Sequence, residues 1–425
     1  MASMSTTALL EQIRSRAGND NARVATDDDA FDGVHPRLVF EPQSSEAVAP
    51  TLAWASSEQL KVQIVGGRSK EAWGVPSGPV DLLFSTACLR SVVEHRHGDL
   101  TATVEAGATL ASVNTTLAAH RQWLPWDPPW MDRATIGGIV ATNDSGPRRH
   151  GYGTPRDSII GVTIARIDGE VAKAGGIVVK NVAGYDLSRL LTGSFGSLGV
   201  IITATFKLAP IPSVSRTLIV ELSSLEVAEP VVAELASSAL TPTALELIYG
   251  HGVTNLLVRF ESVEEAAAQQ ATEASIIVGE RGACRIVEAD DEAALWQRHA
   301  THWDTGGTLV KMSCLPSELM ETLAWLRDAA DASRLELAVA GRGGLGVLDV
   351  RLNGSLELQA SLITELRGRF AVGRGSAVIR RGDVALRQMV DVWGSLGDGA
   401  KVMRAVKQRF DSRELLNTER GPGGL

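Results

Sequence analysis

The sequence contains very little cysteine. Its 3 cysteines are Cys88, Cys284 and Cys314, which lie far apart, and no CxxC pair is present. An iron–sulfur cluster needs several clustered thiolates, and isolated cysteines are typical of proteins from a reducing compartment. We therefore expect neither a disulfide framework nor an iron–sulfur cluster within this chain.

The sequence also has no long apolar run, and we expect no leader peptide. No run approaches the ~18 apolar residues of a membrane span. The first residues, MASMSTTALLEQIRSR, lack the basic, apolar and small-residue regions of a secretory signal. We expect a soluble, cytoplasmic chain without a transmembrane segment, which would reach the inner face of a membrane only through its partners.

The sequence also has fewer basic than acidic residues. The 41 Lys and Arg residues face 50 Asp and Glu residues, which gives a formal charge of −9. Nucleic-acid binding depends on clustered basic residues that neutralise phosphates, so we expect no nucleic-acid partner. The densest basic stretch, residues 367–381, is interpreted as a solvated face.

Glycine, in contrast, is abundant, with 42 residues and no collagen-like period. The length allows two or three domains. Up to the Pro210–Pro212 turn, the pattern predicts an α+β unit with strands at 38–40, 62–65, 80–84, 101–105, 159–166, 175–179 and 198–208, and helices at 44–57 and 110–120.

The sequence pattern changes after the Pro210–Pro212 turn. Short strands alternate with helices rich in Ala and Glu, a pattern that favours an antiparallel sheet covered by helices. The predicted strands are 217–220, 245–248, 256–260, 309–313 and 335–339, with helices at 263–272 and 402–410.

The first of three Gly-rich segments is IVGGRSK, residues 64–70, directly after a predicted strand. Two glycines allow a backbone with positive φ, and successive N–H groups can then form a concave nest for an anion. Arg68, Ser69 and Lys70 add donors and positive charge. The alternative is an ordinary tight turn between a strand and a helix.

The other two segments are TIGGIVATNDSG, residues 135–146, and KNVAGYDLSRLLTGSFGSLGVI, residues 180–201. The Gly137–Gly138 pair permits close approach of a ligand to the backbone. Glycine weakens helices and strands, so four glycines within the apolar third segment favour a bulky ligand lying against it. The three segments together are more specific than any one of them.

These segments resemble the FAD-binding domain shared by vanillyl-alcohol oxidase, the p-cresol methylhydroxylase flavoprotein and enzymes like D-lactate dehydrogenase. The resemblance covers about residues 34–210, and the pairs Phe410-Asp411 and Leu416-Asn417 resemble the closing FDP…LNPG element of that family. Two motifs are most similar to the FAD-binding E subunit of bacterial glycolate oxidase, namely GPRRHGYGTPRDSIIGV, from residue 146, and the third segment.

The resemblance implies an α+β fold: a two-subdomain FAD-binding domain of the p-cresol methylhydroxylase type, followed by an antiparallel-sheet cap domain covered by helices. The expected parts are an N-terminal arm (1–33), the FAD-binding domain (34–211), the cap or substrate domain (212–385) and a C-terminal segment (386–425) that returns to the FAD domain.

The resemblance also implies FAD as the cofactor. Several relatives attach the flavin to a His in the first Gly-rich loop, where this chain has none, so we expect non-covalent FAD. The residues carried over to the cofactor are Gly66, Gly67, Arg68, Ser69, Lys70, Thr135, Ile136, Gly137, Gly138, Thr142, Asn143, Gly146, Gly184, Gly199, Val200 and Ile201.

The implied activity is that of the FAD-binding subunit of a glycolate (2-hydroxy-acid) oxidase or dehydrogenase. Hydride would pass from the substrate α-carbon to the flavin, and electrons would go on to a second flavoprotein subunit and an iron–sulfur subunit. Two alternatives stay open: a non-catalytic FAD-carrying structural or electron-transfer subunit, and an FAD-linked oxidase of another alcohol or sugar.

Catalytic residues are harder to identify from the sequence. Lys311 and Arg342 are candidates for holding the substrate carboxylate, with ordinary surface or ion-pair roles as the alternative, and no base is evident. The His-rich HGGDGN-like motif of related catalytic subunits has no equivalent. His299 and His302 lack a third ligand nearby, so we expect no metal site.

One further motif, residues 341–346, fits GxGxxG. A dinucleotide fingerprint must open a helix, but the following VLDVRL alternates as a strand does. We interpret this motif as a hairpin turn rather than an NAD site.

Overall fold

The computed structural model describes residues 5–17, 21–178, 184–301, 304, 306–370 and 373–425. The chain divides into two compact units. The first contains Met1–Ser145, Thr154–Ile211 and Asp398–Leu425, and the second contains Gly146–Gly153 and Pro212–Gly397. Each unit is described separately below, and the limits expected for the four parts of the sequence remain predictions.

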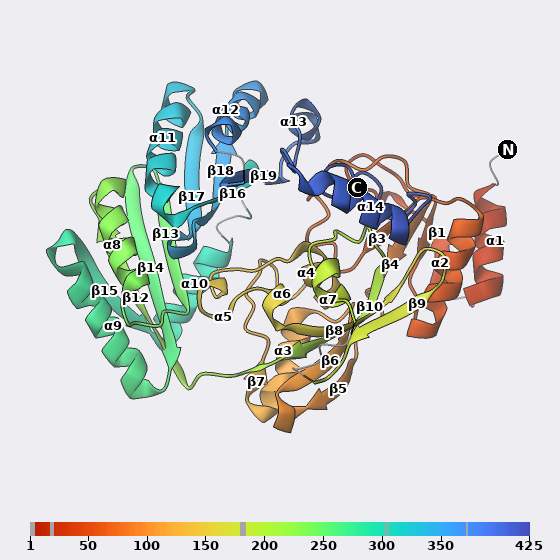
Figure 1. Cartoon of the computed structure of the whole chain (residues 1–425), viewed down its shortest axis with the longest axis horizontal. Coiled ribbons are helices and arrows are strands. Elements are labelled where there is room, and N and C mark those ends of the chain that lie inside the picture. The colour runs from red at the N-terminus through yellow and green to blue at the C-terminus, as the bar shows by residue number, and fades with distance from the viewer. Residues whose placement is uncertain (1–4, 18–20, 179–183, 302–303, 305, 371–372) are drawn as a thin grey trace. The chain divides into compact units, whose positions relative to one another are not determined.

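The first unit contains a four-stranded sheet in the order β1-β2-β4-β3, made by Ala22–Val24, Leu38–Phe40, Leu82–Ser85 and Val62–Val65. The last three strands are parallel, and β1 is antiparallel to β2. Helices α1 (Thr6–Ala17) and α2 (Val48–Ser57) lie side by side against this sheet (Figure 1). Their apolar faces share a core with β2 and β4 through Leu9, Leu52, Leu38 and Phe84.

The second sheet of this unit is antiparallel throughout, in the order β5-β6-β10-β8-β9. Its strands are Val92–Arg96, Thr101–Glu105, Val200–Lys207, Ile159–Ala165 and Val171–Gly175. The other elements of the unit are α3 (Leu110–Leu117), α4 (Ile136–Thr142), α6 (Pro155–Ser158), α7 (Leu187–Leu191), α14 (Gly399–Phe410) and the short pair β7 (Gln122–Trp123) and β11 (Ala209–Pro210).

One predicted strand of this unit is wrong. The strand expected at residues 175–179 lies earlier, as β9, and ends at Gly175, which has a φ of +72°. A Cβ at Gly175 would lie 2.1 Å from the Ile160 carbonyl oxygen, so this close approach of two backbones requires glycine there. Val179 and residues 180–183 lie outside the described residues.

The predicted helix at 44–57 is divided in the structure. Residues Ser45–Ala47 form a 3₁₀ turn, and α2 begins at Val48. Pro50 therefore lies in the first turn of α2, where its missing N–H needs no partner within the helix. The proline fixes where the α-helix can begin rather than kinking it.

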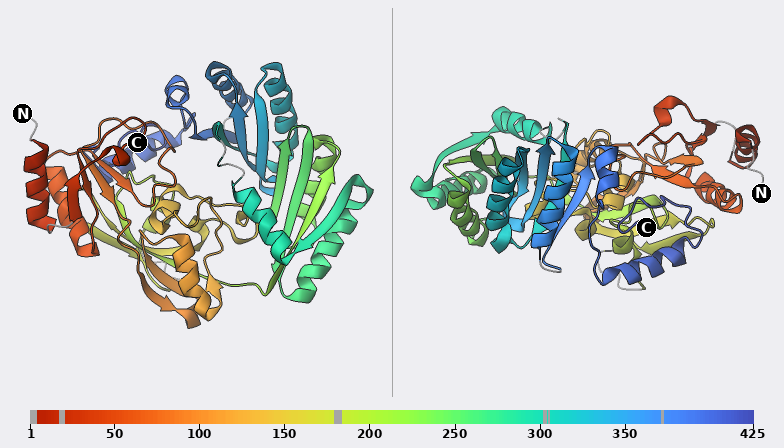
Figure 2. Two further views of the ribbon diagram at one scale, coloured as in Figure 1. Left: turned by 180° about the vertical axis from the view of Figure 1, so that it is seen from behind. Right: turned by 90° about the horizontal axis from the view of Figure 1, so that it is seen from above.

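The second unit is built on an eight-stranded antiparallel sheet. In spatial order its strands are β15 (Gly282–Glu288), β12 (Val214–Leu222), β14 (Val253–Ser262), β13 (Ala244–Gly250), β17 (Glu336–Arg342), β18 (Val347–Asn353), β16 (Thr308–Cys314) and β19 (Gly375–Arg381). Helices α8 (Leu225–Ser237), α9 (Glu264–Val278), α11 (Leu319–Ala332) and α12 (Leu356–Arg369) cover one face, as Figure 2 shows. Two short helices, α5 (Arg149–Tyr152) and α13 (Val384–Met389), complete the unit.

The opposite face of this sheet is polar. Because side chains alternate along a strand, Leu218 and Val220 face the covering helices while Thr217 points the other way. Helix α10 (Ala289–Thr301) lies on this second face, since its Glu292 carboxylate accepts a hydrogen bond from the Thr217 hydroxyl at 2.6 Å. This polar face carries both residues proposed from the sequence to hold a carboxylate.

Two predictions on this unit are confirmed. The GxGxxG stretch joins β17 to β18 as an antiparallel hairpin through a short 3₁₀ turn. The α+β class with an antiparallel sheet covered by helices is also as expected. Among the described helices, none is both long and apolar enough to cross a bilayer.

Candidate functional site

The first Gly-rich loop follows β3 and turns sharply against the second Gly-rich segment. A Cβ at Gly67 would lie 1.7 Å from the Arg133 carbonyl oxygen, and one at Gly66 would lie 2.2 Å from the Thr135 hydroxyl. Within the described part of the chain, no acceptor takes the backbone N–H groups of Gly66, Gly67 or Ser69. With Arg68 at a φ of +54°, the loop presents N–H groups in the concave form that binds anions.

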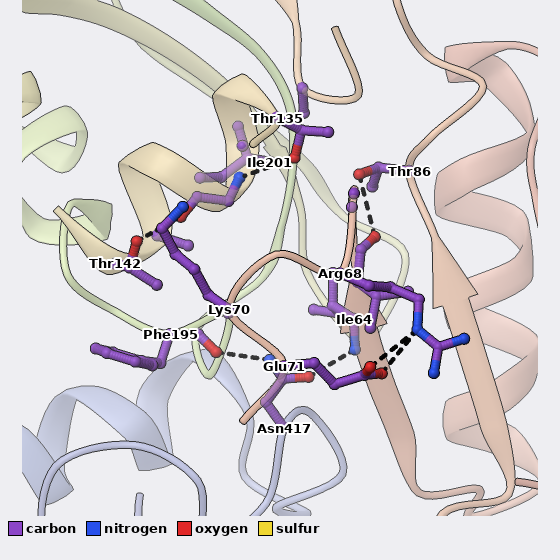
Figure 3. A pocket seen from close by; sticks show the side chains of 18 of the residues that line it. Ile64, Arg68, Lys70, Glu71, Thr86, Thr135, Thr142, Phe195, Ile201 and Asn417 are labelled. Atoms are coloured by element: carbon purple, nitrogen blue, oxygen red, sulfur yellow. Dashed lines mark hydrogen bonds and ion pairs between the residues drawn. The ribbon is translucent and has the colours of Figure 1, made fainter. Parts of the chain in front are cut away.

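This loop forms one wall of a cavity within the first unit, shown in Figure 3. Residues predicted from the sequence to bind the cofactor supply much of the lining, namely Gly66, Gly67, Arg68, Ser69, Lys70, Thr135, Gly137, Gly138, Thr142, Gly199 and Ile201.

The other predicted cofactor residues do not line the cavity. Ile136 and Val200 are fully buried in the apolar cores of the first unit. Asn143 ends α4 with a φ of +48°, and its side chain accepts a hydrogen bond from the Arg156 N–H at 3.3 Å. Gly184 is exposed, and Gly146 belongs to the second unit.

About half of the residues that line the cavity were not predicted from the sequence. The missed residues are Gln63, Ile64, Val65, Glu71, Trp73, Thr86, Ala106, Ala141, Phe195, Gly196, Asn417 and Arg420. Phe195 and Gly196 stand inside the third Gly-rich segment, and Asn417 stands in the closing element, so these three carried a signal. Arg420 lies in no motif that the sequence analysis recognised.

Lys70 supplies the positive charge of the cavity wall. Its Nζ lies 3.3 Å from Asp144 Oδ2 and 5.7 Å from the centre of the Trp73 ring. The Lys70 side chain is 6% exposed and that of Asp144 is fully buried. This ion pair joins the first Gly-rich loop to the second segment.

The guanidinium of Arg68, a residue of the cavity lining, is held by neighbouring groups of the protein. It donates to the carbonyl oxygens of Asp28, at 2.9 Å, and Ala30, at 3.1 Å, and to the Glu71 carboxylate at 2.9 Å. Burial raises the pKa of Glu71, while Arg68 acts in the opposite direction. The Arg68 guanidinium therefore anchors the loop, while the Lys70 ammonium group lies in the cavity wall beside Asp144.

The lining suits a large anionic cofactor with a flat ring. Unpaired backbone N–H groups and Lys70 can take phosphate oxygens, and the glycines leave room for a ring close to the backbone. No His, Cys or Tyr is among the described lining residues, so these residues offer no nucleophile for covalent flavin attachment. The residues thus fit non-covalent FAD.

A second polar cluster lies on the polar face of the second unit. Lys311 on β16 is opposite Asp349 on β18. Burial lowers the pKa of Lys311 to about 7, and the positive charges of Arg380, Arg149 and Arg342 add to this effect, while Asp349 opposes it. No hydrogen bond or ion pair joins Lys311 to another described side chain.

Arg342, in contrast, has carboxylate partners. It is 4% exposed, donates to the Asp349 carboxylate at 3.0 Å and lies 3.8 Å from Glu246. Asp349 also accepts from Arg380 at 2.9 Å. Burial raises the pKa of Asp349, but the arginines outweigh this effect and hold the pKa below its usual value. The structure thus brings Lys311 and Arg342 into one network, in which Lys311 has no fixed counter-ion.

The histidines of this unit are dispersed. His299 Nε2 lies 3.2 Å from Glu246 Oε2, and its ring contacts Trp296, while His302 lies outside the described residues. The described residues contain no group of three His, Cys, Asp or Glu side chains placed to hold a metal ion.

Comparison with known proteins places this geometry among flavoproteins. The family model described as an FAD binding domain matches residues 36–175. The glycolate oxidase subunit GlcE of Escherichia coli is 31% identical over 322 residues, covering 72% of this chain and 87% of that protein. The glycolate oxidase subunit GlcD of Bacillus subtilis is 25% identical, covering 90% and 88%.

Two further proteins are similar to this chain, one in sequence and one in fold. A D-lactate dehydrogenase of Archaeoglobus fulgidus is 27% identical, covering 89% of this chain and 90% of that protein. The solved structure of 4-ethylphenol oxidase from Gulosibacter chungangensis superposes with a TM-score of 0.74 at 13% identity, covering 98% of both chains. At this identity the structural similarity concerns the fold alone.

Proposed function

Because this chain belongs to the glycolate oxidase and D-lactate dehydrogenase family of FAD-dependent oxidoreductases, we propose that it is the FAD-binding subunit of a glycolate (2-hydroxy-acid) oxidase or dehydrogenase. The observation that carries this proposal is the cavity of the first unit. Its unpaired loop N–H groups, its buried Lys70 and its glycine-lined wall are what a non-covalent FAD needs.

The first unit's residues would hold the cofactor by complementary roles. The N–H groups of Gly66, Gly67 and Ser69, together with Lys70, would take the pyrophosphate oxygens. The backbone at Gly137 and Gly138 would also hold the pyrophosphate, and Gly199 would line the remaining part of the cofactor. When bound, FAD supplies the hydride acceptor for oxidation of the substrate's α-carbon.

Lys311 is the residue that we propose for the substrate carboxylate. It is surrounded by Arg149, Arg342 and Arg380, while Asp349 is already shared by two of these arginines. The cluster therefore has an excess of positive charge that an acid would neutralise. Arg342, held by Asp349, would keep this environment in place rather than bind the acid directly.

Electrons would leave through partner subunits. The 3 cysteines of the chain are too few for an iron–sulfur cluster of its own. The relatives include two different glycolate oxidase subunits, GlcD and GlcE. We therefore propose a second flavoprotein subunit and an iron–sulfur subunit as partners.

A second candidate function is that of a non-catalytic FAD-carrying structural or electron-transfer subunit. It is favoured by the dispersed histidines of the described residues, which form no cluster able to order a substrate through a metal. In this case the partner would bind the acid. Oxidation of another alcohol or a sugar is a further alternative, since sugar oxidases share the fold.

The test is the visible spectrum of the purified chain, followed by anaerobic addition of glycolate and of D-lactate. A flavin band that bleaches in the isolated chain supports the catalytic proposal, and K311M should bleach more slowly. Bleaching only after partner subunits are added would support the electron-transfer alternative. A chain that binds no FAD supplied in excess would contradict both.

A further inference from the structure

Residues 411–420, called here the 411–420 segment, support the strand that leads into the first Gly-rich loop. The N–H of Val62 on β3 donates to the Leu415 carbonyl at 2.8 Å, and the Asn417 N–H donates to the Val62 carbonyl at 2.9 Å. The segment therefore runs beside β3 as an additional edge. A part of the chain remote in sequence thus helps to fix one wall of the FAD cavity.

The Asn417 side chain joins two walls of this cavity. Its Oδ1 accepts from the Ile64 N–H at 2.6 Å, and its Nδ2 donates to the Phe195 carbonyl at 2.6 Å, as Figure 3 shows. Asn417 has a φ of +43°, a conformation that asparagine tolerates better than most residues. A Cβ at Gly196 would lie 2.6 Å from Asn417 Nδ2, so the amide fits only against glycine.

Arg420 holds the chain that follows the Gly-rich loop. It is 4% exposed and donates to the carbonyl oxygens of Glu71 and Trp73, the latter at 2.7 Å, and to the Ser77 hydroxyl at 2.7 Å. Asp32 lies 3.6 Å from its guanidinium. Arg420 and Asn417 both line the cavity.

The base of the segment is anchored by a buried ion pair. Lys407 Nζ lies 2.7 Å from Asp411 Oδ2 and donates to the carbonyl oxygens of Ser197 and Leu416, each at 2.9 Å. The Asp411 carboxylate also accepts the N–H groups of Leu415 and Leu416, at 3.0 and 2.8 Å. The segment therefore has a fixed path from α14 to the cavity.

We propose that Asn417 and Arg420 are positioning residues for FAD, and that cofactor binding is coupled to docking of the 411–420 segment. The two side chains hold the walls of the cavity at the spacing that the cofactor needs. Linkage requires the reverse effect as well: bound FAD must hold the segment in place. The proposal rests on the FAD assignment alone and is independent of the substrate.

The first test compares FAD affinities of matched variants. N417G keeps the left-handed backbone but lacks the amide, and R420M keeps much of the side-chain volume but lacks the donors. T418A is the control, because the Thr418 hydroxyl donates within the segment, to the Glu414 carbonyl, and does not line the cavity. Flavin fluorescence gives the dissociation constant of each apoprotein at a temperature where circular dichroism shows it folded.

We expect N417G and R420M to bind FAD about ten- to hundredfold more weakly, since each removes hydrogen bonds that fix the cavity walls, and binding must then order these walls. T418A should remain within about twofold of the unaltered chain. Unchanged FAD affinity in folded N417G and R420M would overturn the proposal, because a merely structural role would change stability without changing affinity in the folded protein.

The second test uses hydrogen exchange of the unaltered chain and therefore stands even if a variant fails to fold. FAD should slow exchange of the N–H groups of residues 415–417. Equal exchange with and without FAD would overturn the coupling. A chain that binds no FAD would overturn the cofactor assignment too, whereas bound flavin that no acid reduces would contradict only the proposed substrate.

Discussion

At the scale of single residues, the two units place charged side chains in buried positions for different purposes. Lys70 has a dedicated partner in Asp144, so its charge is neutralised in the resting cavity wall. Lys311 has no such partner, and its pKa is lowered to about 7 by burial and the surrounding arginines. The Asp144 carboxylate fixes the position of the Lys70 ammonium group in the cavity wall, whereas Lys311 has no carboxylate of its own.

Binding of the acid should weaken as the pH rises through about 7. Lys311 is protonated below its lowered pKa and neutral above it, and only the protonated form attracts a carboxylate. K311M should raise the Kd about ten- to hundredfold at pH 6.5, the size expected for a charged hydrogen bond, while K311R should bind with a flatter pH profile. R374M, which alters a half-exposed arginine of the same unit, is the control.

The same residue should destabilise the folded chain. Between pH 7 and 10.5 the unfolded chain keeps a lysine proton that the folded chain has released, so the contribution of Lys311 to stability rises with pH in this window. K311M should therefore raise the Tm at pH 7 while weakening acid binding. A lower Tm for K311M in thermal melts would contradict the unpaired charge.

For the Lys70–Asp144 pair we predict that removing one charged partner destabilises the folded chain. Removing one partner of a buried ion pair leaves an uncompensated charge, which costs about 3–5 kcal/mol. D144N should lower the free energy of unfolding by about that amount in urea titrations, and adding K70M to D144N should recover part of the loss. E170Q breaks an exposed pair with Arg166 and should change stability by at most about 1 kcal/mol.

At the scale of elements, α10 is held on its sheet by polar side chains rather than by an apolar stripe. Its only residue that is nearly inaccessible is Glu292, which accepts from the hydroxyls of Ser215 and Thr217 and lies 3.1 Å from Arg259 Nε. Trp296 adds a hydrogen bond from Nε1 to Thr217 at 2.9 Å. Such a helix depends on a few directional contacts.

E292A should therefore release α10 from the polar face. Arg259 would lose its closest carboxylate on this helix, and the expected cost is about 3–5 kcal/mol. Hydrogen exchange of residues 289–301 should become faster, while exchange in the covering helices α8 and α9 should change little. D291A, an exposed carboxylate of the same helix, should leave exchange unchanged, and equal effects of both variants would contradict the assigned role of Glu292.

At the scale of the whole molecule, the first unit is discontinuous in sequence and the second is largely one insertion within it. The described residues that line the proposed FAD cavity all belong to the first unit. A ligand that binds only the folded state stabilises the part that contains its site, by about 2.7 kcal/mol at a hundred times its Kd.

Thermal unfolding should therefore show two transitions, of which FAD raises only one. Calorimetry with and without FAD checks this expectation, and N417G should reduce the shift. A single transition that moves as a whole with FAD would show that the two units unfold together.

Local features of this protein can be predicted from short stretches of its sequence. Strands such as 38–40, 62–65 and 101–105 are encoded by short runs rich in apolar and β-branched residues, and they appear in the structure with those limits. The glycines of the Gly-rich segments indicated a bulky ligand close to the backbone, and the resemblance of these segments to a flavoprotein family identified it as FAD. Both features depend on neighbours in sequence.

Contacts between side chains that are distant in sequence became evident from the folded chain and not from sequence patterns. Nothing near Arg68 in sequence shows that its guanidinium turns toward Asp28 and Ala30, or that Arg420 reaches Trp73. The environment of Lys311 likewise comes from α5 and three neighbouring strands. Charge, burial and pairing depend on which segments meet in space, and sequence patterns report only what lies within a few residues along the chain.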